Sequence, residues 1–134
     1  GMVVPRFIEK ALKNETIQVY GDGKQSRCFT YVGDVVEAIT KLAASDKAIG
    51  KVLNIGSDKE ISINELADLV IKMTGSASGK ECISYEKAYG AAFDDMLRRV
   101  PCLERIKETI GYHPKTSLEE TLGIIIEDFK GGNK

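Results

Sequence analysis

Several residue types and patterns that common functional classes depend on are missing from this sequence. It has no tryptophan, one histidine and three cysteines without a C-x-x-C spacing, so it offers no cluster typical of a zinc site. Its 19 basic and 20 acidic residues nearly cancel, and no basic run favours a nucleic-acid or membrane-surface partner. The longest apolar runs are only a few residues, too short to cross a bilayer. These absences favour a globular domain that binds neither nucleic acid nor membrane and holds no metal.

The N-terminus and the cysteines bear on where the protein works. No charged segment followed by an apolar stretch opens the chain, so no secretory signal is predicted. Cys28, Cys82 and Cys102 are interpreted as reduced, semi-buried thiols, and the expected location is cytoplasmic. Gly1 resembles the remnant of a cleaved tag. Met2 is then either the natural start or an internal residue at a chosen fragment boundary.

Length and composition predict a single domain covering residues 1–134. A chain of 134 residues can bury a modest core. Its 43% hydrophobic and 29% charged residues argue against disorder. The last four residues, Gly131–Lys134, are expected to fray.

Helices are indicated by apolar residues at helical spacing and by capping residues. Glu37 follows Asp34 by three positions, a cap signature, and Ser62–Glu65 and Ser117–Glu120 are full capping boxes. The five predicted helices run from about Val3 to Lys13, from Asp34 to Ala43, from Ser62 to Gly75, from Pro101 to Gly111 and from Ser117 onward.

Four short β-branched or aromatic runs predict strands. They are Ile17–Tyr20, Arg27–Val32, Lys51–Ile55 and Glu81–Tyr85. Together with the helices they follow the order α-β-β-α-β-α-β-α-α, which predicts an α/β fold with a small mixed sheet. The segment Glu86–Asp95 has no convincing period and is expected to be irregular.

The stretch from Ile17 to Asp34 is the most specific part of the chain. It contains a strand, a turn with two glycines, an arginine and a second apolar strand. Gly21 and Gly23 allow positive φ angles and let a ligand approach the backbone closely. Arg27 presents a planar, charged guanidinium group that suits phosphate oxygens. Taken alone, the same residues also fit a plain β-hairpin followed by a solvated arginine.

This stretch resembles the motif V-Y-G-D-G-x-Q-x-R-x-F-x-Y-V-x-D of the NAD-dependent sugar epimerase/dehydratase family, which consists of extended short-chain dehydrogenases acting on nucleotide sugars. Gly33 stands where many members have an aspartate. The element Lys51–Gly56 resembles the family's strand–N-x-G segment. Asp94–Glu120 resembles its R-x-P-D segment and G-Y-x-P-x-T-S-L-E-E tail, with Cys102 at the usual aspartate. UDP-sugar 4-epimerases and UDP-glucuronate decarboxylases are the most similar members.

The resemblance implies the C-terminal, substrate-binding part of such an enzyme. Arg27 and Arg99 are then expected on the diphosphate, and the Val19–Tyr20 strand edge beside the nucleobase. The implied substrate-binding residues are Val19, Tyr20, Gly21, Arg27, Asn54 and Arg99. Without the resemblance, other interpretations stay open: a half-buried strand aromatic at position 20, a turn that needs a small residue after Asn54, and surface pairing of the two arginines at 98–99 with the aspartates at 94–95.

The chemistry of the family needs groups that this chain lacks. It has no G-x-x-G-x-x-G fingerprint after a first strand and no Y-x-x-x-K pair on a helix. Tyr20 and Lys24 match the pair literally, but two glycines place them in a turn. His113 has no acidic or nucleophilic companion at motif spacing. No catalytic residue is therefore assigned. The chain is expected to bind no cofactor itself, and NAD is implied only for a full-length family enzyme.

Three functions stay open at this stage. The first is a nucleotide-sugar-binding domain of an NAD-dependent epimerase/dehydratase acting on UDP- or dTDP-sugars, incomplete as a catalyst by itself. The second is a non-catalytic binding or assembly module, and the third a truncated remnant without a ligand. A homodimer is also expected, because the absence of a Rossmann half would expose the apolar side chains of Phe29, Tyr31, Val35, Val36 and Ile39.

Overall fold

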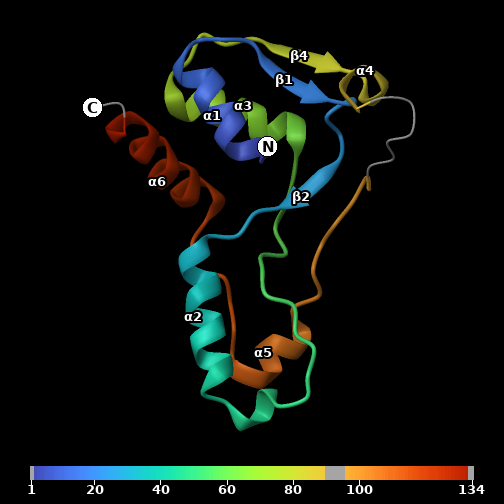
Figure 1. Ribbon diagram of the computed structural model, residues 1–134, viewed down its shortest axis with the longest axis vertical. Helices are drawn as coiled ribbons and strands as arrows, with labels where there is room; N and C mark the ends of the chain where they lie inside the picture. The colour runs from blue at the N-terminus through green and yellow to red at the C-terminus, as the bar shows by residue number, and fades with distance from the viewer. Residues whose placement is uncertain (1, 90–95, 133–134) are drawn as a thin grey trace. The chain divides into compact units, whose positions relative to one another are not determined.

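The computed structural model describes residues 2–89 and 96–132 (Figure 1). The elements in chain order are α1 (Val3–Leu12), β1 (Ile17–Tyr20), β2 (Ser26–Cys28), α2 (Val32–Ala43), a 3₁₀ turn η1 (Asp46–Ala48), β3 (Glu60–Ser62), α3 (Ile63–Thr74), β4 (Lys80–Ile83), α4 (Tyr85–Tyr89), α5 (Glu104–Ile110) and α6 (Leu118–Gly131). Across the described ranges, no helix has both the length and the apolar character needed to cross a membrane. The predicted α/β class is confirmed.

The chain folds as two compact units, each built from separate stretches of sequence. Within the described residues, unit 1 takes 2–27, 61–89, 96–98 and 122–132, and unit 2 takes 28–60 and 99–121. Because both units are discontinuous in sequence, neither corresponds to a domain that a simple cut would release. The expectation of one domain for 1–134 stays a prediction.

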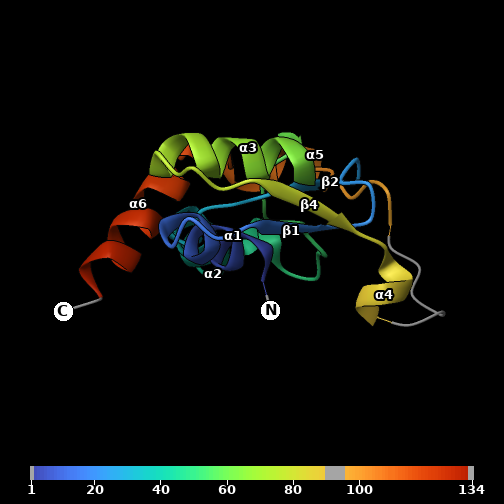
Figure 2. The ribbon, with the colours of Figure 1, turned by 90° about the horizontal axis from the view of Figure 1, so that it is seen from above.

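Unit 1 is organised around a parallel pair of strands. β1 pairs with β4, with Ile17 opposite Lys80 at one end of the pair and Tyr20 opposite Ile83 at the other. Helices α1 and α3 pack against each other and against β1 (Figures 1 and 2). The side chains of Ile17 and Val19 are fully buried while Gln18 is exposed, the alternation of a half-buried strand.

Unit 2 has a smaller core between α2 and α5. Ala38, Ile106 and Tyr112 are buried together. Partly buried apolar residues close around them: Leu42, Leu53, Ile55, Leu103 and Ile110. The two helices therefore hold the non-helical segment around Leu53 against one face of the unit.

Two helix starts and two helix ends follow local sequence as predicted. At α3, Glu65 N–H donates to Ser62 Oγ (3.1 Å) and Ser62 N–H donates to Glu65 Oε2 (2.9 Å). Ser117 and Glu120 make the same reciprocal pair at α6 (3.1 and 2.8 Å). Gly75 and Gly111, with φ of 64° and 67°, end α3 and α5 in the left-handed region that disfavours other residues.

The structure corrects several helix bounds. α2 begins at Val32, and Asp34 lies inside its first turn, where it binds backbone groups elsewhere in unit 2 instead of capping the helix. α5 begins at Glu104, so Pro101 precedes the helix. α4 occupies part of the segment expected to be irregular, whose remainder, 90–95, lies outside the described residues. α6 runs to Gly131, the first residue of the expected frayed tail.

The strands also differ from the prediction. The second strand covers Ser26–Cys28 instead of Arg27–Val32, and the fourth is shifted by one or two residues to Lys80–Ile83. β3 (Glu60–Ser62), which was not predicted, pairs with β2 in a second two-stranded sheet. Because β1 and β2 belong to different sheets, the turn between them is not a hairpin. The predicted strand Lys51–Ile55 is absent from the described secondary structure.

Candidate functional site

The residues assigned from the resemblance divide between the two units. Val19, Tyr20, Gly21 and Arg27 belong to unit 1. Asn54 and Arg99 belong to unit 2. Within unit 1, the first three are consecutive residues at the end of β1 and the start of the following turn.

Gly21 lies where only glycine fits. Its φ is 72°, and an added Cβ would lie 2.5 Å from the ring of Tyr85, at the start of α4. Its N–H donates to the carbonyl of Ile83 (2.8 Å), which continues the β1–β4 pairing by one residue. The backbone can therefore pass this close to the Tyr85 ring because residue 21 has no side chain.

Gly23 and its neighbours are fixed by the first turn of α3. Gly23 has a φ of 71°, and a Cβ there would lie 2.4 Å from the side chain of Asn64. Asn64 N–H donates to the Gly23 carbonyl (3.0 Å), and its Nδ2 donates to the Asp22 carbonyl (2.8 Å). Lys24 N–H donates to Asp22 Oδ1 (3.0 Å), closing a local Asx turn. The turn is therefore held both by hydrogen bonds from Asn64 on α3 and by the hydrogen bond between Lys24 and Asp22 inside the turn.

Gln25 ties the end of the turn back to its beginning. The residue is only 6% exposed, and its Nε2 donates to the Tyr20 carbonyl (2.8 Å). The Gln25 carbonyl in turn accepts from Ile63 N–H (3.1 Å) at the start of α3. Neither Gln25 nor Asn64 was assigned from the sequence, although Gln25 is a fixed letter of the motif.

Tyr20 stacks against an arginine that the sequence analysis did not single out. The guanidinium carbon of Arg6, on α1, lies 4.3 Å from the centre of the Tyr20 ring. This is within the range of a cation–π contact. Arg6 Nε is buried and has no hydrogen-bond partner among the described residues. Tyr20 is half-buried, as its alternative interpretation expected, and Val19 beside it is fully buried, so Val19 offers only backbone atoms.

Arg27 is half-buried and bound to backbone carbonyls. Its Nη1 donates to the Ser26 carbonyl (2.7 Å) and to the Met96 carbonyl (2.8 Å). Ser26 N–H also donates to the Leu97 carbonyl (2.9 Å). The interpretation of Arg27 as a merely solvated surface group is therefore wrong. Its assignment to a phosphate stays a prediction.

In unit 2, Asn54 lies beside the segment that carries Arg99. Asn54 is exposed, and its Nδ2 donates to the carbonyl of Cys102 (3.2 Å). This hydrogen bond uses the backbone carbonyl of residue 102, so it does not depend on the cysteine side chain. Arg99 is exposed. The interpretation that Arg99 pairs with the aspartates at 94–95 lies outside the described residues.

Gly56, two residues after Asn54, is buried. A Cβ on Gly56 would lie 3.4 Å from Pro101 Cγ and 3.5 Å from Thr30 Oγ1. The Tyr112 hydroxyl donates to the Gly56 carbonyl (2.9 Å). Burial raises the pKa of Tyr112, with a further contribution from the negative charge of Asp34. Both Cβ distances are ordinary van der Waals contacts, so the interpretation of this turn as one that needs a small residue stays a prediction.

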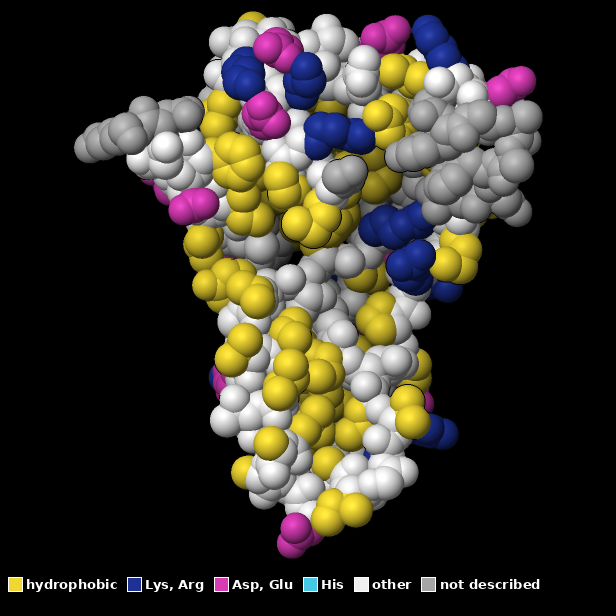
Figure 3. All heavy atoms as spheres, viewed as in Figure 1, with side chains coloured by type: hydrophobic (Ala, Val, Ile, Leu, Met, Phe, Trp, Pro, Cys, Tyr) yellow, Lys and Arg dark blue, Asp and Glu magenta, His cyan; other side chains and the backbone are white. Residues whose placement is uncertain are grey.

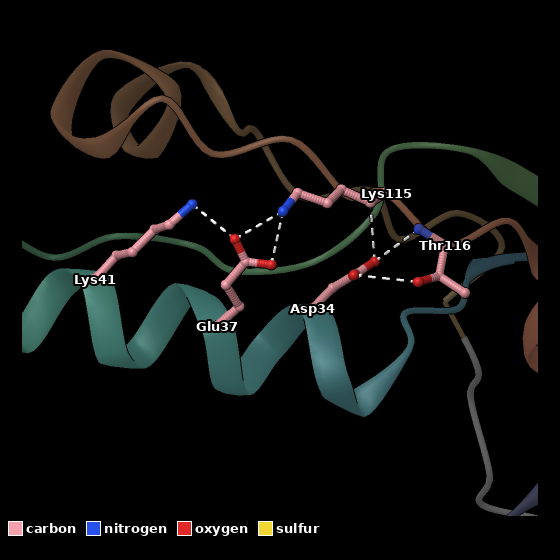
Figure 4. Close-up of polar contacts among 5 residues, drawn as sticks. All are labelled: Asp34, Glu37, Lys41, Lys115 and Thr116. Carbon is pink, nitrogen blue, oxygen red and sulfur yellow. Dashed lines mark hydrogen bonds and ion pairs between the residues drawn. The ribbon is translucent and has the colours of Figure 1, made fainter.

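Asp34 joins α2 to the segment before α6 within unit 2. It is 7% exposed, and its Oδ2 accepts from the N–H groups of Lys115 and Thr116, both at 3.0 Å (Figure 4). Glu37, one turn later, accepts from Lys115 Nζ (2.8 Å) and pairs with Lys41 Nζ (2.7 Å) (Figure 4). Hydrogen bonds from Lys115 and then from Lys41 lower the pKa of Glu37 to about 2. This network fixes the segment at 115–116 against α2 within unit 2.

No catalytic or metal-binding set emerges from the described residues. They contain no group of His, Cys, Asp or Glu side chains arranged to hold a metal ion. Tyr20 ends β1 and Lys24 follows in the loop, so the two residues do not share a helix, as expected. All three cysteines are free thiols, but Cys82 and Cys102 are exposed, contrary to the semi-buried expectation.

Comparison with known proteins gives consistent matches along nearly the whole chain. The profile of a family described as GDP-mannose 4,6 dehydratase matches residues 2–125. The UDP-N-acetyl-alpha-D-glucosaminuronate decarboxylase of Bacillus cytotoxicus is 43% identical over 128 residues, covering 96% of this chain. MoeE5, solved in complex with UDP-glucuronic acid and NAD, is 32% identical with a TM-score of 0.83 over 98% of this chain. The UDP-glucose 4-epimerase of Thermotoga maritima, solved with UDP-glucose, is 30% identical with a TM-score of 0.79 over 100% of it.

The reverse coverage is much lower. This chain spans 40% of the Bacillus cytotoxicus protein, 42% of the MoeE5 chain and 41% of the Thermotoga maritima chain. The similarity in sequence and fold confirms the resemblance seen in the motifs. The match is to part of each relative, consistent with the expected C-terminal part.

Proposed function

We propose that this chain, which belongs to the GDP-mannose 4,6 dehydratase family, binds the nucleotide diphosphate portion of a UDP- or dTDP-sugar. The ligand-contacting residues in this proposal are Val19, Tyr20, Gly21, Arg27, Asn54 and Arg99. The backbone at Val19–Gly21 faces the base, and the two arginines face the diphosphate. A cytoplasmic location also belongs to the proposal.

The rigid turn after β1 is the observation that carries this proposal. Both of its glycines have positive φ, and its carbonyls at Tyr20, Asp22 and Gly23 are each held by a hydrogen bond. A preorganised backbone of this kind loses little entropy when a flat polar ring binds against it. Two relatives of at least 30% identity were solved with UDP-glucuronic acid or UDP-glucose, which supports the same ligand class here.

Binding of NAD by this chain does not fit the residues that are present. A dinucleotide site needs a glycine turn that leads from a strand into a helix N-terminus with free N–H groups. The Gly21–Gly23 turn leads from β1 to β2 instead. The nearby N-terminus of α3 already donates its Ile63 and Asn64 N–H groups to the turn. We therefore assign no cofactor and no reaction step to this chain alone.

A non-catalytic binding module is the second candidate function. It shares the ligand with the first and differs only in whether a catalytic partner exists. The contacts of the turn support both equally. A remnant without ligand is the third alternative, and a binding measurement separates it from the other two.

Isothermal titration of the chain with UDP, UDP-glucuronic acid and dTDP tests the proposal. We expect saturable but weak binding of at least one of them, because the chain spans 42% of a relative that holds both a nucleotide sugar and NAD. Inorganic pyrophosphate serves as the control for unspecific attraction to arginines. Absence of heat with all three nucleotides at millimolar concentration, from a chain whose circular dichroism shows it folded, would reject the proposal.

A further inference from the structure

The turn after β1 also forms part of the N-terminal cap of α3. The start of a helix leaves its first N–H groups without partners inside the helix. In α3, Ile63 N–H donates to the Gln25 carbonyl (3.1 Å), and Asn64 N–H donates to the Gly23 carbonyl (3.0 Å). The capping box satisfies the N–H group of the next residue. The turn and the start of α3, both in unit 1, therefore satisfy each other's backbone groups.

The side chain of Asn64 makes a second, separate contact with the turn. Its Nδ2 donates to the Asp22 carbonyl (2.8 Å), one residue before the carbonyl that its own N–H group binds. The half-buried amide group also packs against Gly23, where a built Cβ would lie 2.4 Å from it. One residue of α3 thus fixes two consecutive carbonyls of the turn, and its amide fits there because residue 23 has no side chain.

The carbonyls that Asn64 fixes lie directly after the backbone assigned to the base, Val19–Gly21. Gln25, whose carbonyl accepts from Ile63 N–H, donates its own Nε2 to the Tyr20 carbonyl (2.8 Å). Hydrogen bonds therefore connect the first turn of α3 to the proposed nucleotide site. Lys and Arg side chains gather in Figure 3 over the part of this face where Figure 1 draws β2, the strand after the turn, so a phosphate-bearing ligand meets positive charge there.

We propose, on the basis of the function proposed above, that Asn64 is a positioning residue for the nucleotide and couples the nucleotide site to the start of α3. Asn64 does not contact the ligand itself. With its Nδ2 donor in place, the turn already has the conformation that binds. Without that donor the turn populates further conformations, and the apparent affinity falls with the fraction that is competent to bind. The coupling is reciprocal, so a bound nucleotide also protects the first turn of α3.

The variant Asn64→Asp separates positioning from folding. The aspartate has the same shape but only acceptor oxygens at neutral pH, so it cannot donate to the Asp22 carbonyl. Asp22 is exposed, and water replaces the lost donor there. The new charge lies at the second residue of α3, where the helix macrodipole favours it. We therefore expect a melting temperature within about 3 °C of the parent, although the turn loses its fixed geometry.

Titration calorimetry and hydrogen exchange on the whole chain test the proposal. Asn64→Asp should weaken UDP binding by roughly three- to tenfold, the effect of about one net hydrogen bond, with a less favourable binding entropy. Before UDP is added, amides 22–25 should exchange roughly fivefold faster than in the parent. In the parent, UDP should slow the amides of residues 63 and 64. Light scattering on the same samples gives the stoichiometry and checks the homodimer expected from the sequence, which stays a prediction.

Two further variants make the test specific to this contact. Lys72→Gln, at an exposed residue near the other end of α3, is the matched control and should change neither UDP affinity nor exchange at 22–25. In Gly23→Ala the new Cβ displaces the Asn64 amide, so this variant should weaken UDP binding as well. Adding Asn64→Asp to Gly23→Ala should weaken it little further, because both changes remove the same contact.

Equal UDP affinity in the parent and Asn64→Asp would overturn the proposal and leave the proposed function standing. The same holds if Asn64→Asp weakens binding only together with faster exchange in the β1–β4 pair and a large fall in melting temperature, because Asn64 would then act on folding as a whole. Fully additive losses in the double variant would also contradict it. If the folded parent binds no UDP, both proposals fail, and the titration of the parent tells this case from the others.

Discussion

Asp34 and Thr116 are joined by a two-point contact across 82 positions of sequence: Thr116 N–H donates to Asp34 Oδ2 (3.0 Å), and its hydroxyl donates to Oδ1 (3.2 Å). Lys115 N–H supplies a third donor to the same carboxylate (3.0 Å). Because Asp34 is nearly buried, these donors replace the water that the charge would otherwise have. The contact fixes the segment leading into α6 against the first turn of α2 within unit 2.

Replacing this carboxylate should destabilise the protein. In Asp34→Asn, an amide group would face two N–H donors and a hydroxyl, so at least one acceptor is lost. We expect a loss of about 2 kcal/mol in the free energy of unfolding, measured by urea denaturation. Asp58→Asn, at an exposed residue, is the control and should change it by less than about 0.5 kcal/mol. Equal effects of the two variants would contradict the role of the buried contact.

The ion pairs of Glu37 should add a pH dependence in the acid range. The pKa of Glu37 in the folded protein is lowered from 4.5 to about 2, first by Lys115 and then by Lys41. Because the folded pKa lies below the unfolded one, the stabilising contribution is complete above about pH 4.5 and is lost as pH falls toward 2. NMR titration of the Glu37 carboxyl checks the value.

Lys115→Met is the matching variant for that titration. It removes the larger cause of the shift and should raise the Glu37 pKa toward its ordinary range, while Lys41 still lowers it in part. Added salt should also raise the Glu37 pKa, because the ion pair with Lys115 is exposed and salt screens it. An unchanged pKa in Lys115→Met would show that Lys115 does not hold this carboxylate in solution.

The first glycine of the turn should tolerate alanine less well than a glycine with similar φ and free space. Gly75 has a φ of 64° and no atom within 4 Å of a built Cβ, so Gly75→Ala should cost only the left-handed strain of about 1–2 kcal/mol. Gly21→Ala should exceed that by at least about 1 kcal/mol, because its Cβ would also lie 2.5 Å from Tyr85. Thermal unfolding of both variants measures the difference. Equal losses would mean that the Tyr85 ring moves aside freely.

The two arginines assigned to the diphosphate should affect ligand affinity. Arg99→Ala should weaken UDP binding by roughly ten- to a hundredfold, equivalent to about 1.5–3 kcal/mol for a charge-assisted contact. Arg105→Ala, another exposed arginine of unit 2, is the matched control and should leave affinity unchanged. Titration calorimetry gives both values. Equal affinity in the parent, Arg99→Ala and Arg27→Ala would reject the assignment.

Arg27 needs a further control, because it also binds two carbonyls. Arg27→Lys keeps the charge but cannot reproduce the planar fork. We expect Arg27→Ala to lower both stability and UDP affinity, since it releases the Met96 carbonyl. If Arg27→Lys restores stability without restoring affinity, the fork acts on the ligand. If both return together, Arg27 acts only by positioning residues 96–98.

The chain alone should not bind NAD and should not turn over nucleotide sugars. The glycine turn lies between two strands, and the first amides of α3 are already used. Equilibrium dialysis with NAD and an assay with UDP-glucuronic acid check the two parts of this prediction. Saturable NAD binding at micromolar concentration by the purified chain would contradict it.

The parts of the fold that could be predicted from sequence are those decided within a few residues. The capping boxes at Ser62–Glu65 and Ser117–Glu120 form as predicted, because each needs only one helical turn to satisfy its own donors. Gly75 and Gly111 end their helices for an equally local reason, a left-handed residue without a Cβ. The family and its α/β fold could also be predicted from the sequence. The motif around Gly21 and Gly23 belongs to a turn in which a side chain at either glycine would clash with a neighbouring residue.

What the sequence could not decide depends on groups far apart in the chain. The sequence predicted Asp34 as a helix cap, but its carboxylate accepts from the backbone N–H groups of residues 115 and 116 instead. Arg6 meets Tyr20 only because α1 packs beside β1. The run Lys51–Ile55 has a strand's composition and a strand's burial, but a strand exists only where a neighbour supplies its hydrogen bonds. Local sequence therefore determined the helices and the turn, and tertiary structure alone decided the strand pairing and the partners of the buried charges.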